Sequence, residues 1–105
     1  MPSIMAMLDE SSIGLKVVAR ITEVRGRNGC GRCSYGHVVG EEFRISERCP
    51  ANMCVWAFNS LFPFATALRF GGSLPWEDSP NRASVACPDP ENTVVFELRV
   101  LDEAP

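Results

Sequence analysis

The chain has 105 residues, a hydrophobic fraction of 46%, a charged fraction of 22% and a net charge of −3. This length suffices for one domain with a single modest core, and the composition is that of a globular chain rather than a disordered one. The negative charge argues against nucleic acid as the main partner, because phosphate binding depends on clustered Lys and Arg side chains. The ten basic residues are scattered along this sequence.

The first thirteen residues, MPSIMAMLDESSI, lack the basic start, the long apolar run and the cleavage site of a secretory signal. We therefore expect a flexible N-terminal tail over residues 1–13, followed by one globular domain over residues 14–105. Five cysteines without a signal peptide indicate a reducing compartment, where disulfides do not persist, and so a cytoplasmic location.

Two segments at opposite ends of this domain alternate between apolar and polar residues, which is the period of a half-buried strand. The first covers residues 15–24, and the second covers residues 93–101. Lys16 and Arg20 of the first are predicted to lie across from Glu97 of the second, because opposite charges on facing strands are mildly stabilising. Two shorter strands are predicted around residues 42–45 and 83–86.

One helical region is predicted within residues 51–72, where apolar residues recur at spacings of three and four. Pro63 should kink this helix or restart it, and Gly71 and Gly72 should end it. The helix is apolar almost all round, which predicts burial on more than one side. Polar residues interrupt the run, so a membrane span is not expected.

The order strand, strand, helix, strand, strand predicts an α+β domain. We expect a small antiparallel sheet of about four strands with one kinked, largely buried helix packed on it.

Two sets of soft ligands are available for a metal. Spacing alone offers Cys30-x2-Cys33 followed by Cys49-x4-Cys54, which is close to a four-cysteine zinc site. The second set comprises Cys33 and His37 in a glycine loop, Cys54 at the start of the helix, and Cys87 after the third strand. Both sets suit zinc, and iron–sulfur clusters also bind to thiolates, so spacing does not decide between them.

Several motifs together resemble a family of short proteins of unknown function. They are Cys33-x2-Gly36-His37-x2-Gly40, Cys54 at the start of an aromatic-rich helix, LRFGG, PW and CPDPENTVVFEL. The match covers residues 15–101, and it departs from the family at Ser34 and at Gly40-Glu41. The resemblance implies that Cys33, His37, Cys54 and Cys87 are the ligands and that Cys30 and Cys49 are extras. It implies no reaction.

The function predicted from these residues is a small metal-binding protein with a Cys3His site for Zn²⁺, with iron or a [4Fe–4S] cluster as the alternative. A second hypothesis is a metal-dependent enzyme with an open coordination position and His37 as acid or base. A third is an accessory protein that docks a partner through exposed aromatic residues. We expect a homodimer, and a small-molecule ligand is compatible with either of the first two hypotheses. Plain structural cysteines are the alternative to all three.

Four further residues are candidates for the surroundings of the site. Asp89 in the CPDP turn could bond the backbone locally or orient His37. Trp56 and Trp76 could line a pocket, although a role in the core or at a subunit contact is the simpler interpretation. Arg69 could meet an anionic ligand.

Overall fold

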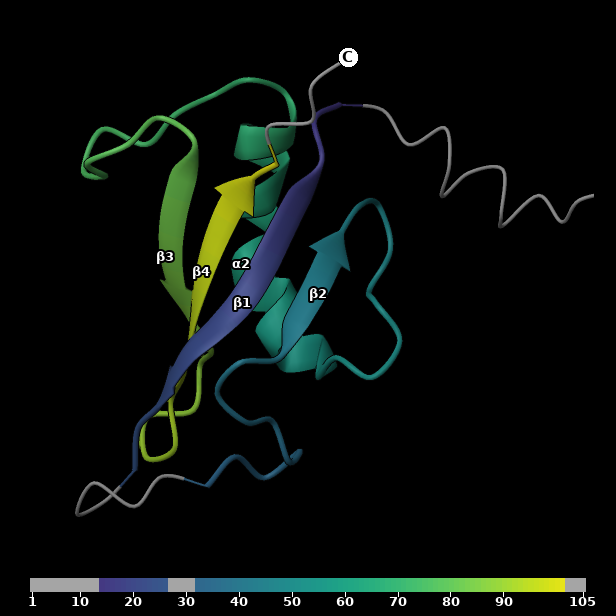
Figure 1. The fold of residues 1–105 in the computed structure, drawn as a ribbon. Coiled ribbons are helices and arrows are strands. Elements are labelled where there is room, and N and C mark those ends of the chain that lie inside the picture. Colours follow the sequence, from purple (N-terminus) through teal and green to yellow (C-terminus); the bar gives the residue numbers. More distant parts are fainter. Residues whose placement is uncertain (1–13, 27–31, 102–105) are drawn as a thin grey trace, which may run out of the picture.

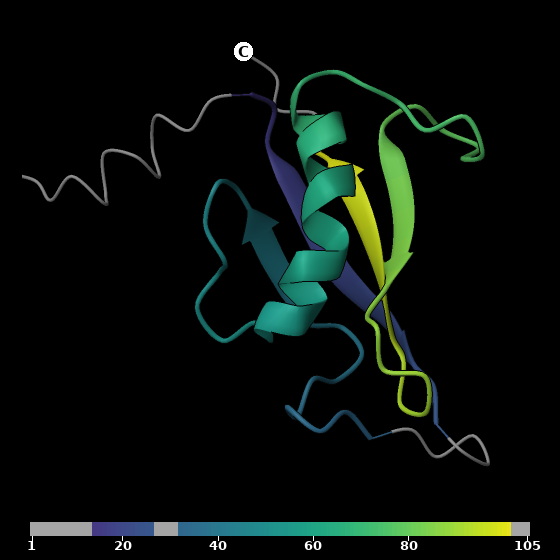
Figure 2. The ribbon, with the colours of Figure 1, turned by 180° about the vertical axis from the view of Figure 1, so that it is seen from behind.

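The computed structural model describes residues 14–26 and 32–101. The predicted tail of residues 1–13 and the segment with Cys30 lie outside the described residues. The elements, in chain order, are β1 (Val17–Val24), β2 (Glu42–Ile45), α2 (Val55–Arg69), β3 (Arg82–Ala86) and β4 (Val94–Val100). The strands form an antiparallel sheet in the order β2-β1-β4-β3, and α2 packs on one face of it (Figures 1 and 2). The predicted α+β architecture is confirmed.

The two central strands, β1 and β4, are the two segments with the clearest alternation in sequence. Val17, Ala19 and Ile21 of β1 are buried, whereas Arg20 and Thr22 are exposed. Arg20 pairs with Glu97 across the β1–β4 ladder, as the charges predicted, whereas Lys16 lies beside Leu101 and not across from Glu97. An irregularity between Ile21 and Glu23 interrupts the register and turns the end of β1 relative to its start.

Helix α2 is continuous across Pro63, so the alternative of a restart at this residue is wrong. Its burial is also narrower than the sequence suggested. The side chains fully packed against the sheet form one stripe, namely Ala57, Leu61, Ala65 and Leu68. Val55 and Trp56, at the first turn, are 61% and 71% exposed. The helix is thus amphipathic in the ordinary sense, although its outer face is more apolar than usual.

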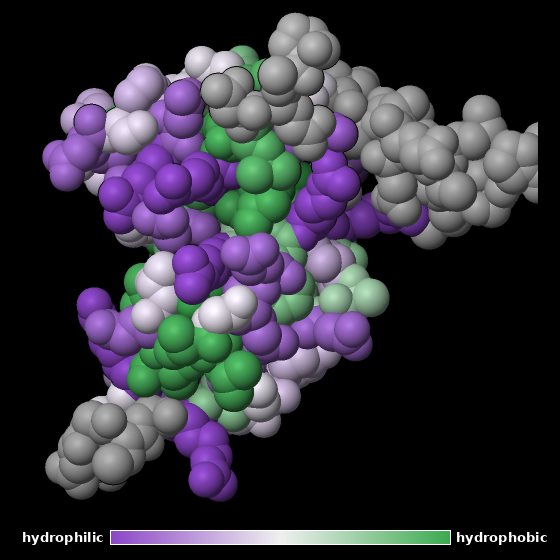
Figure 3. Space-filling view, in the orientation of Figure 1, coloured by the Kyte–Doolittle hydropathy of each residue, from purple (hydrophilic) through white to green (hydrophobic). Residues whose placement is uncertain are grey.

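The core fills the space between this stripe and the inner face of the sheet. Its largest members are Ile21, Phe96 and Leu98 from the sheet and Leu61 and Leu68 from the helix. The opposite face of the sheet carries mostly hydrophilic side chains with a narrower band of apolar ones (Figure 3). Among the described residues, no helix combines the length and the apolar character needed to cross a bilayer.

Three connecting segments meet at the end of the molecule where α2 begins. They are the loop before β2, the residues that lead into α2, and the turn between β3 and β4 (Figure 2). Each segment brings one of the predicted cysteines, so this end of the fold is where a site can form.

Candidate functional site

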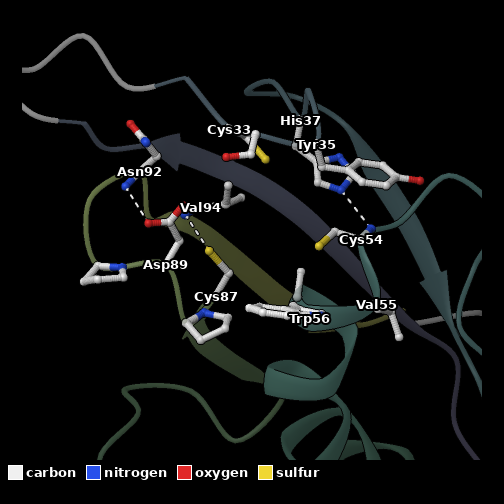
Figure 4. Close-up of a pocket in the computed structure, with 14 residues that line it drawn as sticks. Cys33, Tyr35, His37, Cys54, Val55, Trp56, Cys87, Asp89, Asn92 and Val94 are labelled. Carbon is white, nitrogen blue, oxygen red and sulfur yellow. Dashed lines mark hydrogen bonds between the residues drawn. The ribbon is translucent and has the colours of Figure 1, made fainter.

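A cavity of about 620 Å³ lies between these three segments. Its lining includes all four residues of the predicted ligand set that the family resemblance implied, together with two aromatic residues and Asp89 (Figure 4). The principal residues are Cys33, Tyr35, His37, Cys54, Trp56, Cys87 and Asp89. Residues that are 54 positions apart in sequence thus face one space.

The loop before β2 places Cys33 and His37. The backbone N–H of Gly36 donates to the carbonyl oxygen of Cys33 at 3.0 Å, which closes a turn. Gly36 and Gly40 have φ angles of 101° and 98°, a region that other residues rarely adopt, and they flank His37 on both sides. The loop therefore needs these glycines to turn the imidazole inward.

His37 is only 4% exposed, and its ring packs edge-on against Phe43 with 5.4 Å between centroids. Its Nδ1 lies 3.0 Å from a carboxylate oxygen of Glu41, and its Nε2 lies 3.1 Å from the backbone nitrogen of Cys54. A carboxylate accepts and a backbone N–H donates, so these partners assign the proton to Nδ1 and leave Nε2 as the acceptor. Both ring nitrogens are engaged in this geometry. A metal bond from Nε2 would require the ring to release the Cys54 N–H.

Glu41 links this histidine to the rest of the loop. The same carboxylate oxygen that faces His37 also accepts the backbone N–H of Val38 at 2.9 Å. The Val38 N–H lowers the pKa of Glu41, and the contact with His37 lowers it further. Glu41 is therefore held in its charged form as the partner of a buried imidazole.

Cys54 occupies the N-cap position of α2, where its carbonyl accepts the N–H of Phe58 at 3.0 Å. Its side chain makes no capping hydrogen bond, and the first turn contains no acidic residue. The N-terminal end of a helix is a favourable location for negative charge, and a metal-bound or nucleophilic cysteine carries one. The sulfur points into the cavity (Figure 4).

Cys87 follows β3 and faces the start of β4. Its N–H donates to the carbonyl of Val94 at 2.9 Å, and its sulfur accepts the N–H of Val94 at 3.2 Å. This N–H fixes the direction of the Cys87 side chain. Asp89 is used locally, since one of its oxygens accepts the N–H groups of Glu91 and Asn92 at 2.9 and 3.1 Å. The carboxylate that orients His37 is Glu41 instead.

Three residues considered from the sequence lie away from the cavity. Trp76 packs against Phe64, with 6.2 Å between ring centroids. Arg69 is buried at the far end of α2 and pairs with Glu47 at 3.3 Å, which excludes it from the cavity lining.

Cys49 also does not line the cavity, and its sulfur faces the carbonyl oxygens of Pro50 and Met53. Loss of solvent around this sulfur raises the pKa of Cys49, and the neighbouring Cys54 thiol raises it further. This thiol therefore resists deprotonation, which does not favour the ligand set that was based on spacing alone.

The three cavity cysteines do not converge on a single point. Within residues 14–26 and 32–101, no group of three or more His, Cys, Asp or Glu side chains is arranged to hold one metal ion. In a tetrahedral zinc site with Zn–S bonds of about 2.3 Å, the sulfurs would lie about 3.8 Å apart. As arranged, the residues do not fit a closed Cys3His shell around one zinc ion.

Comparison of the chain with family models, with curated proteins and with solved structures found no match. The resemblance described from the motifs stays a prediction.

Two parts of this site were not anticipated. Glu41 stands four residues after His37, and its role depends on the turn at Gly40, which sequence spacing does not reveal. The bond from Val94 to the Cys87 sulfur arises from the pairing at the β3–β4 turn, so the only signal was the proximity of CPDP to a strand.

Proposed function

We propose that the protein binds a metal group through the thiolates of Cys33, Cys54 and Cys87. The observation that supports this proposal is the arrangement of three thiols from three separate segments around one cavity. Each of the three also packs against the hydrophobic core, so the shared cavity, and not their burial, is what supports a role as ligands. All three are partly buried, so their thiols are shielded from bulk solvent but still reach the cavity.

An iron–sulfur cluster suits this arrangement better than a single zinc ion. In a cluster, each thiolate binds a different iron atom, so the sulfurs need not meet at one point. A zinc ion would require the three segments to close in by several rotamer or loop changes. Zinc is therefore the second candidate for the bound group.

His37 acts in this proposal as a positioning residue. It holds the N-terminus of α2, and thereby Cys54, against the loop that carries Cys33. The enzyme hypothesis, with His37 as acid or base, is less favoured because both ring nitrogens already have partners. Three protein thiolates would leave one iron of a cubane cluster without a protein ligand, which is where a small-molecule ligand would bind.

The experiment is metal and sulfide analysis of the protein purified without oxygen and without added metal. We expect about three to four iron atoms and a similar amount of acid-labile sulfide per chain, with a brown colour. About one zinc per chain, without colour, would support the thiolate site and replace the cluster by a single ion. Less than about 0.2 equivalents of either metal would overturn the proposal.

Single Cys→Ser variants separate ligands from other cysteines. Cys54→Ser and Cys87→Ser should each lose the metal, whereas Cys49→Ser is the matched control and should retain it. Equal metal content in all three variants would contradict the assignment. If Cys49→Ser loses the metal while Cys87→Ser retains it, the result would favour the four-cysteine set that spacing alone offers.

The exposed aromatic residues support a second candidate function, contact with a partner. Trp56, Phe70 and Trp76 are 71%, 58% and 65% exposed, which is unusual for side chains of this size. A homodimer that covers any of these side chains would bury it, and sedimentation at several protein concentrations tests this assembly. A strictly monomeric protein would contradict the homodimer.

A thiolate site would also be compatible with the predicted cytoplasmic location.

A further inference from the structure

Basic residues that are far apart in the sequence lie together on the face of the sheet opposite α2. Outward-facing positions on the four strands bring together Arg20, Arg44, Arg82 and Arg99, and Lys16 directly precedes β1. At the outward positions of the strands that the structure describes, Glu42 and Glu97 are the acidic residues beside them. Glu23 lies farther along β1, beyond the irregularity, and forms an ion pair with Arg25. The chain as a whole has a charge of −3, so its charge is polarised toward this face.

Strand register arranges the arginines in a row across the sheet. Val18 of β1 pairs with Arg44 on one side and with Arg99 on the other, and Arg99 pairs in turn with Arg82. Adjacent strands lie about 4.8 Å apart, so this row spans about 14 Å. Figure 3 views the molecule from this side of the sheet.

The neighbouring row of outward residues contains two carboxylates, which partly neutralise the positive charge of the arginine row. Arg20 lies between Glu42 and Glu97, and the Glu97 carboxylate lies 2.9 Å from Arg82 and 3.1 Å from Arg99. One carboxylate thus serves two guanidinium groups. Because each guanidinium has five N–H donors, the pair retains donors for further acceptors.

We propose that this face docks an acidic polypeptide segment of a partner protein, with its carboxylates on the row Arg44, Arg99 and Arg82. The guanidinium fork matches a carboxylate in a bidentate geometry, and Val18, which lies between Arg44 and Arg99 in the row, provides apolar surface between the charges. Single-stranded nucleic acid fits less well, because its bases stack on aromatic side chains and the outward positions of these strands carry none. The surface lies across the sheet from the cysteine cavity, so this inference is independent of the metal proposal.

Fluorescence anisotropy with a labelled octaglutamate peptide tests the proposal, with a labelled octaserine peptide as the neutral control. We expect the glutamate peptide to bind and the serine peptide not to bind. The affinity should fall as NaCl rises from about 50 to about 200 mM, because exposed charge pairs are screened. The double variant Arg44→Gln/Arg99→Gln should weaken binding by about fivefold or more.

The control is the single variant Arg32→Gln, which removes one basic side chain outside the sheet and should change the affinity by less than about twofold. Circular dichroism verifies that each variant is folded. Absence of octaglutamate binding to the full chain, or binding that the double variant leaves unchanged, would overturn the proposal. A single-stranded oligonucleotide of equal charge that binds more tightly than the peptide would overturn it in favour of nucleic acid.

Discussion

The buried ring of His37 joins two segments of the chain. Its removal should therefore lower the stability of the fold as well as affect the cavity. His37→Ala leaves the Cys54 N–H without its acceptor, removes one of the two contacts of the Glu41 carboxylate and opens a cavity against Phe43. We expect the free energy of unfolding to fall by about 2–3 kcal/mol. Urea denaturation measures the loss, with Ser34→Ala in the same loop as a control that should change it by less than about 0.5 kcal/mol.

The same variant discriminates between a positioning histidine and a ligand. If three cysteines hold the metal, folded His37→Ala protein should retain most of its metal. Complete loss of the metal without loss of stability would show instead that the histidine itself is a ligand.

Glu41 gives the protein a defined acid sensitivity. Its pKa in the folded protein lies below the ordinary value of 4.5, so the charged carboxylate stabilises the fold above pH 4.5. This contribution is lost as the pH falls from 4.5 through the lowered folded-state pKa, because the carboxylate must then be protonated. Glu41→Gln should therefore be less stable than the parent at pH 7, and the difference should shrink at pH 3. Thermal melts at several pH values measure it, and a difference independent of pH would contradict the assignment.

At this scale, sequence reasoning found which residues meet but not how they bond. Cys33, His37, Cys54 and Cys87 were placed together by the motif resemblance, and the structure brings all four to one cavity. The hydrogen bonds that engage both nitrogens of His37 depend on turn geometry and on the first backbone N–H of a helix. Neither is encoded in residue spacing.

Helix α2 approaches the sheet closely because two members of its buried stripe are alanines. Ala57 and Ala65 are 2% and 0% exposed, so neither site has room for a larger side chain. Ala65→Leu should lower the free energy of unfolding by about 1–3 kcal/mol through overpacking. The control is Asn59→Leu on the exposed side of the same helix, which should be nearly neutral. Equal effects of the two variants in urea denaturation would contradict this packing.

The strands were easier to predict than the helix face, for a physical reason. Alternation with a period of two is clear in β1 and β4, where buried apolar residues alternate with Arg20, Glu97 and Arg99, although Val18 and Val95 interrupt the polar face. In α2 the many aromatic residues predicted burial on more than one side. The packed stripe instead combines alanine with leucine, because the helix backbone lies close to the sheet. Trp56 and Val55 remain exposed beside the cavity.

For the whole molecule, the proposed metal group would be bound by three separate segments and should couple their stability. Ligand that binds only the folded state adds about 2.7 kcal/mol at one hundred times its Kd. In a domain of this size, removal of the metal should therefore lower Tm by about 10 °C or more. Differential scanning calorimetry before and after treatment with a strong chelator measures this change. Cys87→Ser protein is the control, since its Tm should not respond to the chelator.

The strand order has a consequence for how the chain becomes structured. β1 and β4 are the first and last of the described strands, yet they are neighbours at the centre of the sheet. While the chain is being synthesised, β1 can pair with β2 but lacks its central neighbour until residues near Val100 leave the ribosome. Closing so long a loop is slow compared with local pairing, so α2 and all three cavity cysteines wait on the final strand. A cofactor could then bind all of its ligands only after β4 has been synthesised. In nascent chains arrested before that point, the thiols of Cys33 and Cys54 should be exposed to solvent.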